Sequence, residues 1–421
     1  MTIKKEVLKN GLSIVTESMT HVRSVAVGVW IKSGSRHESA NENGISHFIE
    51  HMLFKGTTTR SAETIATTID AIGGQLDAFT TREYVGFYAK VLDEYLDRAF
   101  GLLGDIVLNP TFPEAEIEKE RNVIFEEINM VEDSPQELVH EMFTEHFWKN
   151  HPLGRPIAGT KKTVGRFKRT HIAECFSRCY SPENMVIVAA GHIKHQRIAS
   201  LARRYFGGLA PRQARPQLRE PPLPRPHMIK RNKVELEQAH ICLGTIAPSA
   251  TSDDRYPAHV LNNILGGSLS SRLFQNIREK RGLVYSIFSG LGLYSDGGCL
   301  TIYAGTRSQT VATVVDLIME ELRKLQRGEL TAEEVTRSKD NIKGSLVLGL
   351  ESTSSRMSNL AQQEIYFGRH LTLDETIRKI EGVTLNAVHE MTNRIFDSKH
   401  MGMTIVGNLN GKSMSRRMLK V

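Results

Sequence analysis

Cysteine is scarce in this sequence, whose 421 residues include four: Cys175, Cys179, Cys242 and Cys299. So few thiols do not make a disulfide framework, and no disulfide bridge is predicted. Apolar runs of about eighteen residues or more are absent, and the first ten residues, MTIKKEVLKN, have neither the apolar core of a signal peptide nor the pattern of a transit peptide. We therefore expect a cytoplasmic protein that does not enter a membrane.

A concentrated charge of one sign is also missing. The formal net charge is +7, but Lys and Arg are spread along the chain and no nucleic-acid motif accompanies them. With 40% apolar and 24% charged residues, the composition excludes a fibrous or disordered chain. We expect no nucleic-acid partner. Because one hydrophobic core stops growing at roughly 250 to 300 residues, a chain of 421 residues should form at least two domains.

The same order of elements occurs twice along the chain. Three pairs of strand-like fragments match at offsets between 215 and 218 residues: 25–34 with 240–249, 87–91 with 302–306, and 185–191 with 403–408. Between the copies, the segment 211–227 is rich in proline and shows no helix or strand periodicity. We predict an α+β fold of two homologous domains, at 1–210 and 231–421, joined by a proline-rich linker at 211–230. Each domain should have an antiparallel-rich sheet with helices on one face.

The stretch GISHFIEHMLFKGT, residues 44–57, places two histidines and a glutamate among apolar residues. On a helix, His47 and His51 would project from one face and offer two imidazole nitrogens to a single ion. Glu50 leans over the same patch, which gives the order HxxEH, the reverse of HExxH. Two histidines at this spacing are structural about as often as they bind metal. Burying Glu50 beside them without a cation would be costly, however, and this favours a zinc site.

Catalytic zinc normally takes three protein ligands and keeps a fourth position for water, so another element must supply a ligand. The segment EIEKERNVIFEEINMVED is predicted to be a helix whose buried stripe consists of Ile117, Ile124 and Ile128. Glu120 and Glu127 lie seven residues apart on it, two turns along one face. These two glutamates are the candidates for the third ligand.

With these motifs the chain resembles, over nearly its full length, the inverzincin metallopeptidases of the pitrilysin and insulin-degrading enzyme group. It is most similar to the short bacterial members and to the β-subunit of mitochondrial processing peptidase. The resemblance implies that His47, His51 and Glu127 bind one Zn²⁺ per chain, that Glu50 is the general base, and that Glu120 supports the ligands from behind. The implied activity is that of a zinc metalloendopeptidase, in which a metal-activated water hydrolyses oligopeptides or unfolded segments.

The segment 262–290 resembles the family's second signature, in which an arginine and a tyrosine face the zinc. Here they are Arg278 and Tyr285, which could donate to the oxyanion of a tetrahedral intermediate. Taken without the resemblance, they would be a surface arginine and a tyrosine at the edge of the core. The long members of the family form a clamshell from four such domains, so this chain is expected to be half of one. It should form a homodimer, or a heterodimer with a related subunit, whose Arg/Tyr pair reaches the zinc of the partner.

The segment 73–91 resembles the edge strand to which the family's substrates add by main-chain hydrogen bonds. Asp77, before Ala78, replaces the family's usual asparagine, and an acid there would favour basic residues near the cleavage point. It could equally be an ordinary turn or exposed strand position. Two other functions stay open, a presequence-type processing peptidase and a non-catalytic structural subunit of the same fold.

Overall fold

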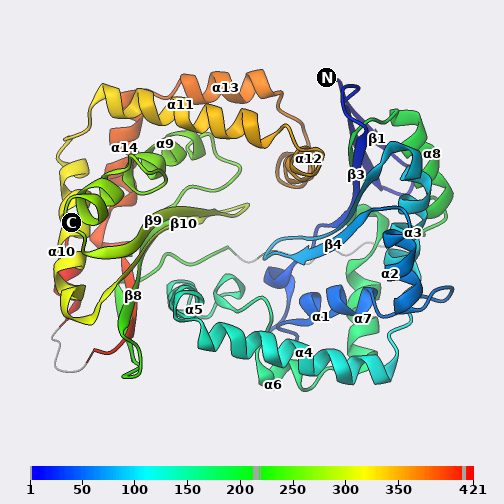
Figure 1. Cartoon of the computed structure of the whole chain (residues 1–421), viewed down its shortest axis with the longest axis horizontal. Helices are drawn as coiled ribbons and strands as arrows, with labels where there is room; N and C mark the ends of the chain where they lie inside the picture. The colour runs from blue at the N-terminus through cyan, green and yellow to red at the C-terminus, as the bar shows by residue number, and fades with distance from the viewer. Residues whose placement is uncertain (1, 212–217, 219, 410–413) are drawn as a thin grey trace. The chain divides into compact units, whose positions relative to one another are not determined.

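The computed structural model of the chain describes residues 2–211, 218, 220–409 and 414–421, so part of the predicted linker, 212–217 and 219, lies outside the described residues. The first sheet contains β1 (Thr2–Val7), β2 (Ser13–Ser18), β3 (Ser24–Ile31), β4 (Gln75–Thr80), β5 (Val85–Leu92) and β6 (Met185–Gly191). The second contains β7 (His227–Asn232), β8 (Gln238–Ala247), β9 (Val284–Leu293), β10 (Gly298–Arg307) and β11 (Gly402–Gly407). The helices, shown with the strands in Figure 1, are α1 (Ile45–Leu53), α2 (Ala62–Asp70), α3 (Leu96–Leu108), α4 (Glu114–Asp133), α5 (Pro135–Phe147), α6 (Lys161–Val164), α7 (Arg169–Cys179), α8 (His195–Phe206), α9 (Arg255–Leu265), α10 (Val311–Gln326), α11 (Ala332–Gly349), α12 (Thr353–Phe367), α13 (Leu373–Glu381) and α14 (Leu385–Ile395).

The chain divides into two compact units that exchange segments. Unit 1 comprises Met1–Asn129, Arg155–Leu218 and Leu348–His370, and unit 2 comprises Met130–Gly154, Arg219–Val347 and Leu371–Val421. The continuous domains predicted at 1–210 and 231–421 differ from these units because each half contributes one helical segment to the other. The segment with α5 belongs to unit 2, and the segment with α12 belongs to unit 1.

The two sheets have the same strand arrangement. The first has the order β1-β2-β6-β3-β5-β4 and the second β7-β11-β8-β10-β9. Each contains one parallel pair, β2 with β6 and β7 with β11, and its other pairs are antiparallel. If β1 is set aside, the five remaining strands of the first sheet correspond in order to those of the second. The predicted duplication of an antiparallel-rich α+β unit is confirmed.

Helices cover both faces of the sheet in unit 1, whereas the sequence led us to expect them on one face. The central strand β6 is buried at every residue, so its two faces both need apolar contacts. The main core lies on the face covered by α1, α3, α7 and α8. On the other face, Met357 and Leu360 of α12 are buried in a cluster with Trp30 and Val188. The helix that completes the cover therefore comes from the distant segment 348–370.

Unit 2 is built in the same way. Its main core gathers residues of α9, α10 and α14 with one face of the sheet. On the other face, Phe143 and Phe147 of α5 pack in a cluster with Cys242 and Tyr303. A Cβ added to Gly244 would lie 2.5 Å from the Phe143 ring, so the absence of a side chain in β8 allows this close packing. The exchanged helix α5 is thus part of the interior of unit 2.

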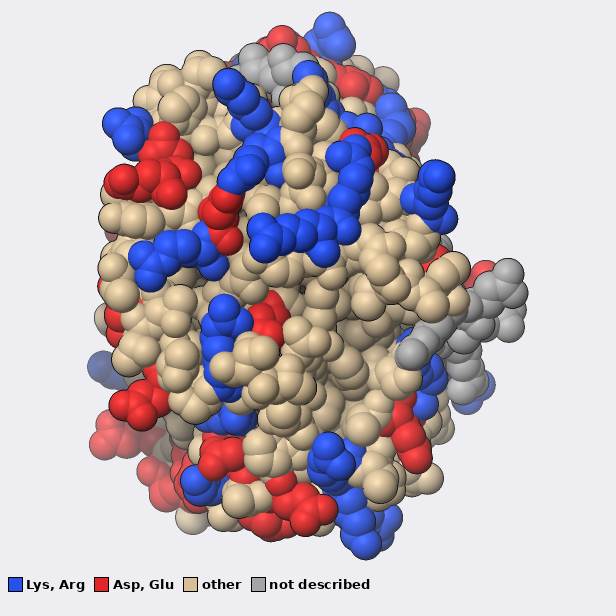
Figure 2. All heavy atoms as spheres, turned by 90° about the vertical axis from the view of Figure 1, so that its right-hand side faces the viewer, with Lys and Arg blue, Asp and Glu red and all other residues tan. Residues whose placement is uncertain are grey.

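The surface shows no simple charge pattern on the side that carries α2, α3 and α8. Figure 2 shows Lys and Arg there together with Asp and Glu, with uncharged surface between them. The four cysteines are buried, and none of them forms a disulfide bridge with another described residue. Within the ranges that the structure describes, none of the helices combines the length and the apolar character needed to cross a membrane.

Candidate metal centre

The helix α1 carries three of the predicted site residues. Its apolar side chains are buried in the core of unit 1. His47, Glu50 and His51 lie half-buried on the remaining face. The four-residue spacing brings the two imidazole rings together, with 4.6 Å between their centroids.

The start of α1 is fixed by a buried carboxylate and by a close backbone contact. Glu38, 6% exposed, accepts hydrogen bonds from the N–H groups of Gly44 and Ser46, both at 2.8 Å. The first N–H groups of a helix lack partners within the helix, and this carboxylate supplies one. Gly44 has a φ of 95°, and a Cβ added to it would lie 2.8 Å from the Cα of Gly159. Burial raises the pKa of Glu38 to about 7.

The helix α4 brings two carboxylates to the histidines of α1. Ile117 and Ile124 are buried and Ile128 is partly buried against the same core, as the predicted isoleucine stripe requires. Glu120 and Glu127 occupy the face toward α1, where each contacts a histidine. Burial of the stripe therefore decides which face of α4 presents its carboxylates to α1.

The ligand atoms offered by His47, His51 and Glu127 all lie within 4.8 Å of one another. The Nε2 atoms of His47 and His51 are 3.5 and 3.6 Å from the carboxylate oxygens of Glu127. Two donors bound to tetrahedral zinc at about 2.0 to 2.2 Å stand roughly 3.3 to 3.6 Å apart, so the spacing fits a single zinc ion. Among the described residues, no other three His, Cys, Asp or Glu side chains come together in this way.

Glu120 holds His51 from the side opposite the candidate metal position. Its Oε2 is 3.0 Å from the Nδ1 of His51, and its Oε1 is 2.7 Å from the Nζ of Lys55. Glu120 is 5% exposed, so Lys55 supplies the counter-charge that a buried carboxylate needs. A proton on Nδ1, shared with Glu120, leaves the Nε2 lone pair of His51 free to bind a metal.

His47 is suited to metal binding by its protonation state. Its pKa is lowered to about 4, because burial disfavours the charged ring and His51 adds repulsion. The imidazole is therefore neutral near pH 7, which is the form that binds metal ions. Its Nδ1 is buried and has no hydrogen-bond partner among the described residues.

Glu50 is held from the strand β4. The Thr80 hydroxyl donates a hydrogen bond of 2.5 Å to its Oε2. Burial raises the pKa of Glu50 above its ordinary value, and the hydrogen bond from Thr80 opposes this rise. The carboxylate lines a cavity of about 270 Å³ together with His51, Leu76 and Ala78. A carboxylate with a raised pKa beside an open cavity has the properties required of a general base.

Asp77 and Ala78 also line this cavity. The Asp77 carboxylate accepts hydrogen bonds from the Ala78 N–H at 2.8 Å and from the Tyr88 hydroxyl at 3.2 Å. Contact of Asp77 and Ala78 with substrate stays a prediction. The sequence analysis missed Thr80, although alternation along a strand places Thr80 on the same face as Ala78.

Arg278 and Tyr285 belong to unit 2. Arg278 lies in a π-helical turn, Phe274–Glu279, with its guanidinium carbon 4.6 Å from the centroid of the Phe274 ring. Tyr285, in β9, is 80% exposed. Both side chains are accessible on unit 2, and their role in catalysis stays a prediction.

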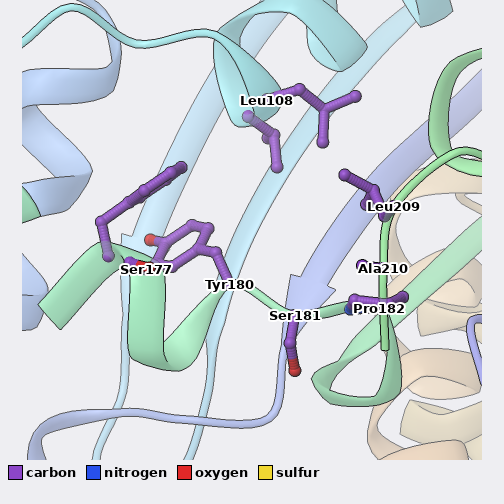
Figure 3. Close-up of a pocket in the computed structure, with 9 residues that line it drawn as sticks. Leu108, Ser177, Tyr180, Ser181, Pro182, Leu209 and Ala210 are labelled. Carbon is purple, nitrogen blue, oxygen red and sulfur yellow. The ribbon is translucent and has the colours of Figure 1, made fainter. Parts of the chain in front are cut away.

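A second cavity in unit 1, of about 210 Å³, lies between the ends of α3 and α7. Figure 3 shows Leu108 and Leu209 bordering it together with Tyr180 and Pro182. Its lining includes no carboxylate, histidine or cysteine. This cavity therefore offers no carboxylate, imidazole or thiol to a metal ion.

Comparison with known proteins identifies the family. Residues 13–161 match the family described as Insulinase (Peptidase family M16), and residues 166–342 match the Peptidase M16 inactive domain. An uncharacterized zinc protease of Bacillus subtilis, YmxG, is 43% identical over 394 residues, which cover 94% of this chain and 96% of the relative. The chain belongs to peptidase family M16. The resemblance expected from the sequence is confirmed.

Other relatives of this M16 chain are also named zinc proteases. That of Mycobacterium bovis is 39% identical, covering 96% of this chain and 93% of the relative. That of Streptomyces coelicolor is 36% identical, and the match covers 99% of this chain and 92% of the relative. A solved protease from Helicobacter pylori has a TM-score of 0.90 at 22% identity, covering 96% of this chain and 99% of that chain. A peptidase M16 inactive domain from Pseudomonas fluorescens has a TM-score of 0.91 at 18% identity, and the match covers 98% of this chain and 100% of that chain. These two structures share the fold of this chain.

Proposed function

We propose that this M16 chain is a zinc metalloendopeptidase that hydrolyses oligopeptides or unfolded segments. The observation that carries the proposal is the spacing of His47, His51 and Glu127, which suits one zinc ion, next to a carboxylate that is not among these donors. The relatives named zinc proteases support the choice of metal. A structural metal site would use a fourth protein ligand, whereas three ligands leave a position open.

The chain supplies the groups that peptide hydrolysis needs. When bound, zinc acts as a Lewis acid that lowers the pKa of a water to about 7 and polarises the scissile carbonyl. Glu50 accepts a proton from the attacking water and delivers it to the leaving nitrogen. Its raised pKa makes it a stronger base than an exposed glutamate. Glu120 keeps the proton of His51 on Nδ1, so that the Nε2 lone pair would be free to bind the ion.

The strand β4 offers a site for an extended substrate. It ends the order of the first sheet and pairs only with β5 among the described strands. Its free edge can pair with a peptide backbone, and the cavity beside Glu50 begins at Leu76, Asp77 and Ala78. Main-chain pairing requires an extended chain, so oligopeptides and unfolded segments are the expected substrates.

Arg278 and Tyr285 are proposed to stabilise the oxyanion at the zinc site of a partner chain. Their accessibility on unit 2 supports this role. Sedimentation of the wild type tests for the dimer. Mixing inactive Glu50→Gln chains with inactive Arg278→Ala chains should restore part of the activity. In a dimer that contains one chain of each variant, one of the two sites would keep both Glu50 and the Arg278 of the other chain. No recovery in a mixture shown to exchange subunits would contradict action in trans, and a monomer would contradict the dimer itself.

The proposal is tested by zinc content and hydrolysis of a quenched fluorescent peptide. Glu50→Gln should retain zinc and lose hydrolysis, whereas Glu127→Gln should lose both. Glu126→Gln is the matched control, because its exposed side chain lies next to Glu127 in α4. Activity of Glu50→Gln equal to wild type would reject the catalytic assignment. A wild-type chain that binds zinc but cleaves no peptide would indicate a non-catalytic subunit, and cleavage at a single type of site in a peptide pool would indicate a processing peptidase.

A further inference from the structure

Thr80 connects the strand β4 to the helix α1. It is the last residue of β4 and pairs with Val85 of β5. Leu76 and Ala78, four and two residues earlier, pack against the core that contains α1. Because strand side chains alternate, Thr80 shares their face and its side chain is directed toward α1.

The contact with Glu50 is a short hydrogen bond. The Thr80 Oγ1 lies 2.5 Å from the Glu50 Oε2, although the two residues are 30 positions apart in the chain. An ionised carboxylate can only accept hydrogen bonds, so the hydroxyl is the donor. Hydrogen bonds to charged groups are shorter and stronger than those between neutral groups. The restricted χ1 of threonine in a strand also gives the hydroxyl a defined direction.

Thr80 provides the single hydrogen bond that the Glu50 carboxylate receives from the residues described by the structure. The negative charges of Glu127 and Asp77 repel the Glu50 carboxylate through space. The bond occupies Oε2, and among the described residues Oε1 accepts no hydrogen bond. The orientation of the carboxylate therefore depends on Thr80.

We propose that Thr80 is the positioning residue for Glu50 and that it ties the general base to the edge strand β4. The inference rests on the proposed function, because it requires Glu50 to be the general base. Thr80 fixes the plane of the carboxylate, so that Oε1 faces the cavity where the proton is accepted. A substrate paired with β4 and the base Glu50 are then positioned by the same strand.

The role is tested with Thr80→Val and Thr80→Ser. Valine keeps the shape and the strand preference of threonine but has no donor, whereas serine keeps the hydroxyl. Thr80→Val should lower kcat roughly 10- to 100-fold, the loss typical when a supporting hydrogen bond to a site residue is removed. Its KM, zinc affinity and melting temperature should stay at the wild-type values. Thr80→Ser should keep most of kcat.

A second comparison tests whether Thr80 acts through Glu50. In Glu50→Asp the side chain is one methylene shorter, so its carboxylate should lie beyond hydrogen-bond distance of the Thr80 hydroxyl, which is 2.5 Å from the wild-type carboxylate. Adding Thr80→Val to Glu50→Asp should therefore change kcat little, whereas Thr80→Val alone should lower the kcat of the wild-type enzyme. Additive effects of the two substitutions would overturn the inference.

Other outcomes also separate this inference from the proposed function. Wild-type kcat in Thr80→Val, or an equal loss in Thr80→Ser, would overturn the role of the hydroxyl. A parallel loss of zinc affinity and thermal stability in Thr80→Val would overturn it as well, because Thr80 would then be a structural residue. If Glu50→Gln remains as active as wild type, the proposed function itself fails and the inference fails with it.

Discussion

The buried carboxylate of Glu38 makes a prediction that the structure allows us to quantify. Burial raises its pKa from an ordinary 4.5 to about 7, while the N–H groups of Gly44 and Ser46 hold it at the start of α1. The folded protein therefore keeps a proton on Glu38 at pH values where the unfolded chain has lost it. Because the folded state binds this extra proton between pH 4.5 and 7, its contribution to stability is lost as the pH rises through that window.

The size of this contribution follows from the two pKa values. A rise from 4.5 to about 7 corresponds to about 3 kcal/mol. Glu38→Gln is neutral at every pH and lacks this contribution. Relative to the variant, the wild type should thus lose about 3 kcal/mol between pH 4.5 and 7.5, or roughly 6 to 12 °C in melting temperature for a cooperative unit of about 200 residues. A difference in stability between wild type and Glu38→Gln that does not vary with pH would reflect only the hydrogen bonds that the substitution changes.

The assay is thermal unfolding of the metal-free proteins across this pH range, so that zinc release makes no contribution. Glu42→Gln is a control of opposite sign. Burial is the largest single influence on Glu42 and tends to raise its pKa, but the hydrogen bond from Arg178 at 2.8 Å, the hydrogen bonds from Ser39 and the charge of Arg178 together outweigh burial and lower the pKa. The Glu42 contribution is therefore present above pH 4.5 and is lost as the pH falls. A difference between wild type and Glu38→Gln that is the same at both ends of the range would refute the reasoning.

Three further predictions concern the metal centre and unit 2. Glu120→Ala should lower zinc affinity roughly 10- to 100-fold in a chelator competition, since the Nδ1 of His51 loses its hydrogen-bond partner. An unchanged zinc affinity would contradict the supporting role of Glu120. Phe143→Ala should reduce the free energy of unfolding, measured in urea, by about 3 to 5 kcal/mol, because the Phe143 ring is buried between α5 and the second sheet. A loss below about 1 kcal/mol would show that the surrounding side chains collapse into the gap. Burial lowers the pKa values of His140 and His240 from the ordinary 6.5, so the stability of unit 2 should be present above pH 6.5 and fall as the pH drops below it. His140→Gln should reduce this dependence in urea titrations, and an unchanged slope would contradict the assignment.

The residues of the candidate site could be predicted because their spacing follows from helix geometry. His47 and His51 share a face of α1 through a four-residue step, and Glu120 and Glu127 share a face of α4 through two turns. Which of the two glutamates is placed as a ligand was not decided by periodicity. The structure puts Glu127 opposite both Nε2 atoms and Glu120 behind His51.

Contacts between distant segments were beyond the reach of the sequence. The exchange of α5 and α12 depends on which apolar helix fits the second face of each sheet, and a continuous domain boundary drawn at the proline-rich segment could not show it. The uninterrupted apolar run of β6, MVIVAAG, is typical of a strand covered on both faces, but it does not indicate which helix provides the second cover.

By itself, the sequence determined the duplicated α+β unit and the helix faces that carry the candidate metal ligands, because strand and helix periodicities are properties of neighbouring residues. Only the tertiary structure decided that Glu38 accepts hydrogen bonds at the start of α1 and that the Thr80 hydroxyl donates a hydrogen bond to Glu50. These contacts form when separate elements pack to within hydrogen-bond distance. Such distances are set by the packed core and not by local spacing along the chain.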